Sequence, residues 1–118
     1  MRTSFLLVSL LLFSACTSSV EIPGLDIEKW NSSEVCSDYR INGATLIEAN
    51  DEVLLSLTQA DIESIFGVAP RHQLWNRNEK FFYYPVTKDC GEGISNTSLF
   101  IRFDALGRAK EVLVLLDD

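Results

Sequence analysis

The stretch that decides the fold runs from residue 57 to residue 84 and has the sequence LTQADIESIFGVAPRHQLWNRNEKFFYY. Thr58 is a favoured N-cap residue, and Asp61, three positions later, completes a version of the capping box. Gly67 suits a C-terminal cap with positive φ, and Pro70 prevents the helix from continuing. A helix of about two turns is not stable alone. We therefore expect it to pack on the strands that follow it.

Residues 72–75 and 80–86 are predicted to form two strands, with a turn at residues 76–78 between them. The run of four aromatic residues within the second strand has high β-propensity. Successive side chains of a strand point to opposite faces of the sheet. The aromatic residues therefore divide into two pairs, Phe81 with Tyr83 and Phe82 with Tyr84, and both faces of the strand are aromatic.

The residues before this stretch predict one more helix. Asn42 can cap a helix over residues 43–56, where apolar residues recur at helical spacing. Asn50 and Asp51 interrupt that pattern, so the helix is expected to be kinked or shortened. Residues 25–39 carry no clear periodicity and are interpreted as an irregular segment.

Two further strands are expected near the C-terminus. Residues 99–104 alternate between apolar and polar side chains, and residues 109–116 place valines on one face. Asp104 and Gly107 suit the tight turn between these strands. The fold class is therefore α+β: two short helices packed on an antiparallel, three- to four-stranded β-meander, in the order α-α-β-β-β-β.

The N-terminus resembles the signal peptide of a bacterial lipoprotein. Arg2 precedes a short apolar run that is too short to span a bilayer. Residues 13–16 read Phe-Ser-Ala-Cys and resemble a lipobox, in which the cysteine is lipidated. The interpretation is a signal peptide at residues 1–15, lipidation of Cys16, a tether over residues 16–24 and one domain over residues 25–118. The alternative is an ordinary secretory signal that is cut near Ala15.

This resemblance also implies a location. Thr17 follows the cysteine where a retention signal would have Asp, which in lipoproteins points to the outer membrane, facing the periplasm. Without Arg2 the chain keeps nine of its ten Lys and Arg against 17 Asp and Glu, a net charge of −8. Such an acidic chain repels nucleic acid and anionic lipid, so nucleic acid is not expected as a partner. Attachment to the membrane would depend on the lipid.

Cys36 and Cys90 are expected to form a disulfide. Two cysteines in the mature part of an exported protein usually pair with each other. A metal site would require closer ligand spacing, and the chain has a single histidine, His72. No metal and no cofactor are therefore predicted.

Several motifs together resemble the SmpA/OmlA family of small outer-membrane lipoproteins, which includes BamE of the β-barrel assembly machinery. The matching residues are Ser56-Leu57-Thr58-Gln59, Ile62, Ile65-Phe66-Gly67, Ala69-Pro70, the aromatic strand, and the turn from Phe103 to Gly107. The resemblance implies a helix-then-sheet scaffold, also found in the β-lactamase-inhibitor-protein fold. The matching residues are structural, so the resemblance transfers no functional residue.

The candidate interface combines aromatic and arginine side chains, which are enriched in protein–protein contacts. Its members are Arg71, Arg77, Phe82, Tyr84, Phe100 and Arg102. The alternative is that the segment around Trp30 folds over this face and completes a second small core.

No catalytic group is predicted. His72 lies beside a turn and is interpreted as a polar edge residue. If the chain were an enzyme, His72 would be the candidate general base. The main hypothesis is a non-enzymatic envelope lipoprotein that binds a protein partner of unspecified identity, in an unspecified oligomeric state. The alternative is an inhibitor or periplasmic ligand-binding module that inserts the acidic loop at residues 89–96 into a target.

Overall fold

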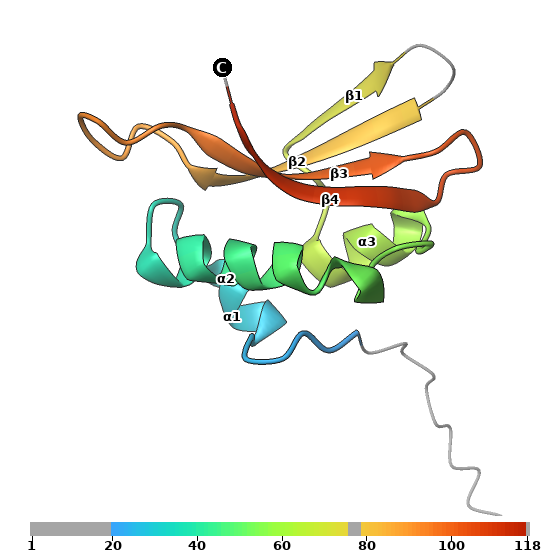
Figure 1. Cartoon of the computed structure of the whole chain (residues 1–118), viewed down its shortest axis with the longest axis horizontal. Coiled ribbons are helices and arrows are strands. Elements are labelled where there is room, and N and C mark those ends of the chain that lie inside the picture. The colour runs from blue at the N-terminus through green and yellow to red at the C-terminus, as the bar shows by residue number, and fades with distance from the viewer. Residues whose placement is uncertain (1–19, 76–78, 118) are drawn as a thin grey trace, which may run out of the picture.

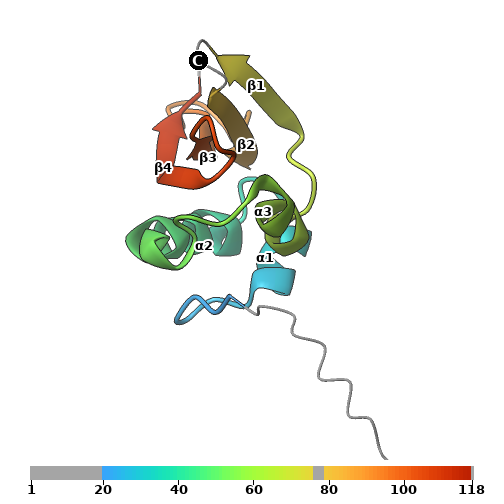
Figure 2. The same ribbon diagram turned by 90° about the vertical axis from the view of Figure 1, so that its right-hand side faces the viewer.

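A computed structural model of the chain describes residues 20–75 and 79–117. Its elements, in order, are α1 (Ile27–Ser32), α2 (Asp38–Ala49), the 3₁₀ turn η1 (Asp51–Val53), α3 (Gln59–Phe66), β1 (Arg71–Trp75), β2 (Glu79–Thr87), β3 (Thr97–Phe103) and β4 (Ala109–Leu116). The helices form one layer and the sheet forms the other (Figures 1 and 2). The predicted α+β class, with helices before strands, is confirmed. The predicted signal peptide and Cys16 lie outside the described residues.

The predicted helix at the centre of the chain is confirmed with its caps. The Thr58 hydroxyl accepts a hydrogen bond from the Asp61 amide at 3.2 Å, and the Asp61 carboxylate accepts one from the Thr58 amide at 3.1 Å. Gly67 ends the helix with φ of +82°. The buried face carries Ile62 and Phe66.

The predicted bounds of the preceding helix are wrong. The structure begins α2 at Asp38, because the Ser37 hydroxyl, and not Asn42, accepts the capping hydrogen bond, from the Arg40 amide at 3.2 Å. The helix ends at Ala49, where the Asn50 side-chain amide donates to the Leu46 carbonyl at 2.9 Å and competes with helix continuation. The expectation of a shortened helix is therefore confirmed.

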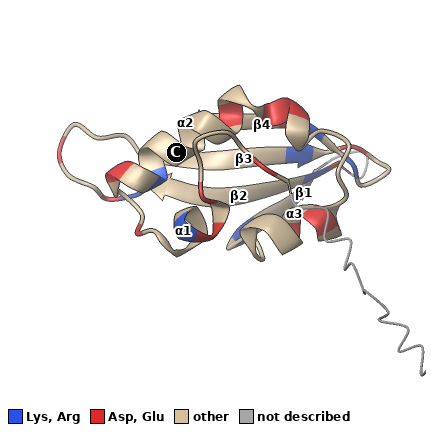
Figure 3. Ribbon diagram, turned by 90° about the horizontal axis from the view of Figure 1, so that it is seen from below, with Lys and Arg blue, Asp and Glu red and all other residues tan. Residues whose placement is uncertain are grey.

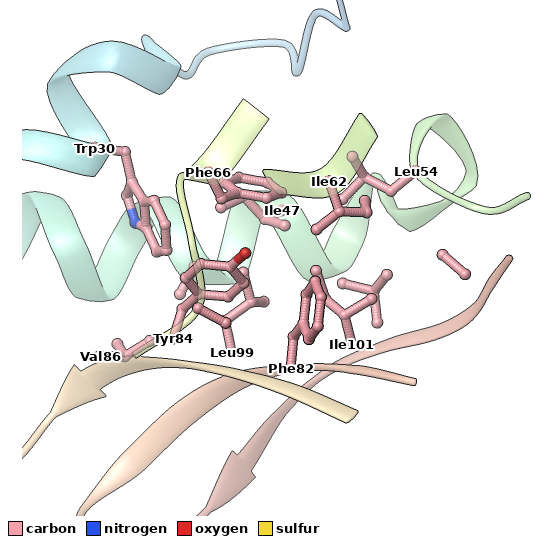
Figure 4. Close-up of a cluster of buried hydrophobic side chains, with 14 of the residues drawn as sticks. Trp30, Ile47, Leu54, Ile62, Phe66, Phe82, Tyr84, Val86, Leu99 and Ile101 are labelled. Atoms are coloured by element: carbon pink, nitrogen blue, oxygen red, sulfur yellow. The ribbon is translucent and has the colours of Figure 1, made fainter. Parts of the chain in front are cut away.

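The segment around Trp30 was predicted to be irregular, but this prediction is wrong, because the segment contains α1. Asp26 caps this helix, and Trp30 is fully buried, with its ring edge-on to Phe66 at 5.6 Å. Figure 4 shows the indole pointing into the core between helices and sheet. The alternative in which this segment covers the far face of the sheet is therefore wrong. The packed domain also begins earlier than residue 25, since Ile22 is 3% exposed within the core cluster.

A buried arginine connects the two layers. The Arg40 guanidinium stacks on the Trp30 ring at 3.8 Å, donates to the Trp30 carbonyl at 2.8 Å and donates to the Pro85 carbonyl of β2 at 2.9 Å. The Trp30 indole nitrogen in turn donates to the Arg40 carbonyl at 3.0 Å. Burial lowers the pKa of Arg40, but arginine stays charged at neutral pH. The buried Arg40 guanidinium therefore connects α1, α2 and β2, and its charge is compensated by these hydrogen bonds and by the Trp30 ring.

The sheet is the predicted antiparallel meander, in the spatial order β1-β2-β3-β4. The turn between β3 and β4 has the expected chemistry: the Asp104 carboxylate accepts from the Leu106 and Arg108 amides, and Gly107 has φ of +77°. The hydrogen bonds from the Arg108 and Leu106 amides help to lower the pKa of Asp104. The turn predicted at residues 76–78 lies outside the described residues.

The predicted disulfide is present. Cys36 and Cys90 are bonded, with their Cα atoms 5.6 Å apart. The Cys36 amide also donates to the Val86 carbonyl at 2.9 Å. The segment between α1 and α2 is thereby attached to the end of β2 and the loop that follows it.

Candidate functional site: the outer face of the sheet

Strand register decides which aromatic pair faces the helices. Phe82 pairs with Ile101 and Tyr84 pairs with Leu99 across β2 and β3. All four side chains are at most 2% exposed, in the core (Figure 4). The assignment of Phe82 and Tyr84 to the interface is therefore wrong. Because both faces of the strand are aromatic, alternation alone could not say which pair lies inside.

The other pair, Phe81 and Tyr83, lies on the opposite side of the sheet together with Phe100. We call this side the outer face. It includes Arg71, Gln73, Glu79, Phe81, Tyr83, Phe100, Arg102, Glu111, Leu113 and Leu115. None of the described helices covers it (Figures 1 and 2). Phe100 therefore faces away from the helices, as expected.

The aromatic rings of the outer face pack tightly on one another. Phe81 and Phe100 stack with centroids 5.2 Å apart and planes inclined by 25°. Tyr83 lies 5.4 Å from Phe100. Phe81 and Phe100 are consequently only 7% and 8% exposed. They form the floor of the face, while Tyr83 is more accessible.

Both arginines that were predicted at the interface and that the structure describes lie on this face. Arg71 lies over the Tyr83 ring at 4.0 Å and donates to the Asp117 carboxylate at 2.7 Å. This contact, with help from the Ser98 hydroxyl, lowers the pKa of Asp117. Arg77 lies outside the described residues.

The second arginine, Arg102, lies between two carboxylates. Its guanidinium is 3.5 Å from Glu79 on β2 and 4.0 Å from Glu111 on β4. Such half-exposed pairs contribute little stability. They do hold three long side chains in place around the aromatic floor.

A shallow hollow of about 380 Å³ opens on the outer face. Its lining residues are Gln73, Glu79, Phe81, Tyr83, Phe100 and Arg102. A second hollow of about 210 Å³ adjoins it, since Tyr83 lines both. A further hollow, about 580 Å³, is lined only by the continuous segment of residues 20–28 where the described chain begins. We therefore take the outer face, to which separate strands contribute, as the candidate site.

The chemistry of the outer face suits contact with an apolar side chain bordered by polar groups. The Tyr83 hydroxyl donates to the side-chain oxygen Oε1 of Gln73 at 3.4 Å, and Glu79 pairs with Arg102. His72 is exposed on β1. Among the described residues there is no group of three or more His, Cys, Asp or Glu that could hold a metal ion.

The sequence analysis missed Gln73, Glu79, Phe81 and Tyr83 as outer-face residues. The signal for Phe81 and Tyr83 was the two-residue period of the aromatic run.

Within the described part of the chain, no helix has the length and apolar character needed to cross a membrane. Comparisons of the sequence with protein-family models, curated proteins and solved structures found no match.

Proposed function

We propose that this chain is a non-enzymatic lipoprotein of the bacterial envelope, and that the outer face of its sheet binds another protein. The observation that carries the proposal is the 380 Å³ hollow with an aromatic floor, on a sheet face that the described helices leave uncovered. Aromatic and arginine side chains at such a face are the residue types enriched at protein interfaces.

The rest of the chain supports the same assignment. The disulfide is typical of oxidising compartments outside the cytosol. Residues 13–16 resemble a lipobox, and the helix-then-sheet order resembles the SmpA/OmlA scaffold. Under this proposal the chain is anchored by an acyl-modified Cys16, in the outer membrane and facing the periplasm.

Site-specific photo-crosslinking in living cells tests the interface. A photoreactive residue in place of Gln73 stands at the exposed rim of the hollow, and the matched control replaces Ser64, an exposed residue of α3. We expect one discrete adduct from position 73 and none from position 64. The adduct from position 73 should disappear when Leu113→Glu places a charge on the outer face beside Phe100. Equal labelling from both positions, or adducts from neither, would refute the outer face as the interface.

A second function is favoured by the loop between β2 and β3. This loop extends beyond the helix layer (Figure 1), exposes Ile94 at 52% and is fixed at its start by Cys90. The side-chain oxygen Oδ1 of Asn96 accepts a hydrogen bond from the Asp89 amide at 3.0 Å and closes the loop base. An acidic, protruding loop that is fixed at its base fits an inhibitor, and inhibition that Ile94→Asp abolishes would favour this function.

A further inference from the structure

The described chain begins on the side of the helix layer that faces away from the sheet. Val20 packs against the core cluster, and Ile22 is buried in it. Figures 1 and 2, which are related by a 90° turn, both place this segment beneath the helices with the sheet above them. The outer face of the sheet and the point of chain entry therefore lie on opposite sides of the domain.

The charged residues are also distributed unevenly between the helix layer and the sheet. Residues 20–70 carry ten Asp and Glu against two Lys and Arg, whereas residues 71–118 carry seven of each kind. One of the two cations in the first part, Arg40, is buried, which leaves Lys29 as its exposed cation. Acidic positions accordingly spread over the helix layer (Figure 3).

The distance from the proposed anchor limits how the domain can turn. Val20 is four residues after Cys16, and an extended chain spans at most about 3.6 Å per residue, or roughly 14 Å here. A helix with its side chains is about 10 Å across, and a packed sheet adds roughly another 10 Å. With its sheet downward, the domain would hold Val20 about 20 Å above the membrane, beyond the reach of this connection.

We propose that the domain is mounted with its acidic helix layer toward the membrane and its outer face toward the aqueous compartment. This inference rests on the lipid anchor of the proposed function and adds the class of partner: a water-soluble protein domain, and not a lipid surface or a membrane-embedded segment. Anionic headgroups repel the acidic helix layer, so the distance between layer and membrane grows at low salt and shrinks at high salt.

Quenching by spin-labelled lipid headgroups tests the orientation. The lipidated chain is reconstituted in phosphatidylcholine vesicles, with one fluorophore on Ser32→Cys at the exposed end of α1 or on Leu115→Cys, which is 38% exposed on β4. We expect quenching at position 32 and none at position 115, relative to vesicles without spin label. Replacing part of the lipid by phosphatidylglycerol should reduce the quenching at position 32, and added salt should restore it.

A longer tether supplies the matched control. Ten Gly and Ser residues inserted after Thr17 add about 35 Å of reach, so the two positions should then become equally quenched. Quenching at position 115 with the natural tether, equal to or above that at position 32, would overturn the orientation and leave the lipoprotein assignment intact. A mature chain whose mass shows no acyl group would refute the proposed function itself, and this inference with it.

Discussion

The Glu48 side chain accepts a hydrogen bond from the backbone amide of Val114, across 66 residues of sequence. Val114 lies in β4, which pairs with β3 on one side and is an edge strand of the described sheet. Glu48 belongs to α2, so its carboxylate occupies the position that a carbonyl of a further strand would take. Edge strands with free amides invite pairing with other chains, and a charged side chain at the edge prevents it.

Glu48→Ala should therefore destabilise the fold and expose the edge of β4. Loss of a hydrogen bond to a charged group typically costs about 1.5–3 kcal/mol, which urea unfolding would measure. We also expect more self-association than in the wild-type chain, as seen by sedimentation at increasing concentration. Glu52→Ala, at an exposed position of η1, is the control and should change neither property. A Glu48→Ala chain with wild-type stability and association would refute this role of the carboxylate.

Gly43→Ala should destabilise the protein, although alanine normally favours helices. A glycine within a helix costs about 1 kcal/mol relative to alanine. At this position, however, an added Cβ would clash with Cδ1 of Trp30 and lie 2.8 Å from its Nε1. The indole cannot move without breaking its contact with Arg40, so we expect a loss of about 1–3 kcal/mol from overpacking.

Thermal unfolding of Gly43→Ala, followed by circular dichroism, measures this loss. Thr45→Ala, at an exposed position of the same helix, is the matched control and should be neutral or slightly stabilising. A gain in stability for Gly43→Ala would show that the contact with Trp30 relaxes without loss.

Tyr84 should make the fold sensitive to alkali. Its hydroxyl donates to the Gly67 carbonyl at 2.8 Å, and burial, with a contribution from Glu63, raises its pKa. A raised pKa in the folded state means that the unfolded state releases its proton first as the pH rises. The contribution of Tyr84 to the free energy of unfolding is therefore fully present below pH about 10, which is the pKa of tyrosine in the unfolded chain. Above that pH the contribution declines.

Tyr84→Phe should lose about 1 kcal/mol at neutral pH, because the Gly67 carbonyl loses its donor. It should also lose less stability than wild type between neutral pH and pH about 11. Parallel urea unfolding at the two pH values measures both effects. Tyr83→Phe, on the outer face, is the control and should keep the alkaline slope of the wild type.

Removal of the disulfide by the double substitution C36A/C90A should cost about 4 kcal/mol on the chain-entropy estimate, for a bridge between residues 54 apart. Urea unfolding of this variant and of the oxidised wild type gives the difference. Reduced wild-type protein should resemble the variant. A loss below about 1 kcal/mol would mean that the unfolded chain already holds these segments together.

Local chemistry explains which features could be predicted from the sequence. The capping box of Thr58 and Asp61 and the positive φ of Gly67 are local, so the bounds of α3 were predictable. The start of α2 was not, because Ser37 and Asn42 are both acceptable caps and packing selects between them. Which aromatic pair faces inward also depended on tertiary context. The register between β2 and β3 places Phe82 and Tyr84 beside Ile101 and Leu99, inside the core.

The bridge between Cys36 and Cys90 also constrains the order of events during maturation. If a translocating chain emerges N-terminus first, the thiol of Cys36 reaches the oxidising side well before Cys90 does. It waits there as a free nucleophile until β1 and β2, the first two strands of the sheet, have followed. Closure of the ring then becomes a late step, and a thiol oxidase that acts too early would find only one of the two sulfur atoms.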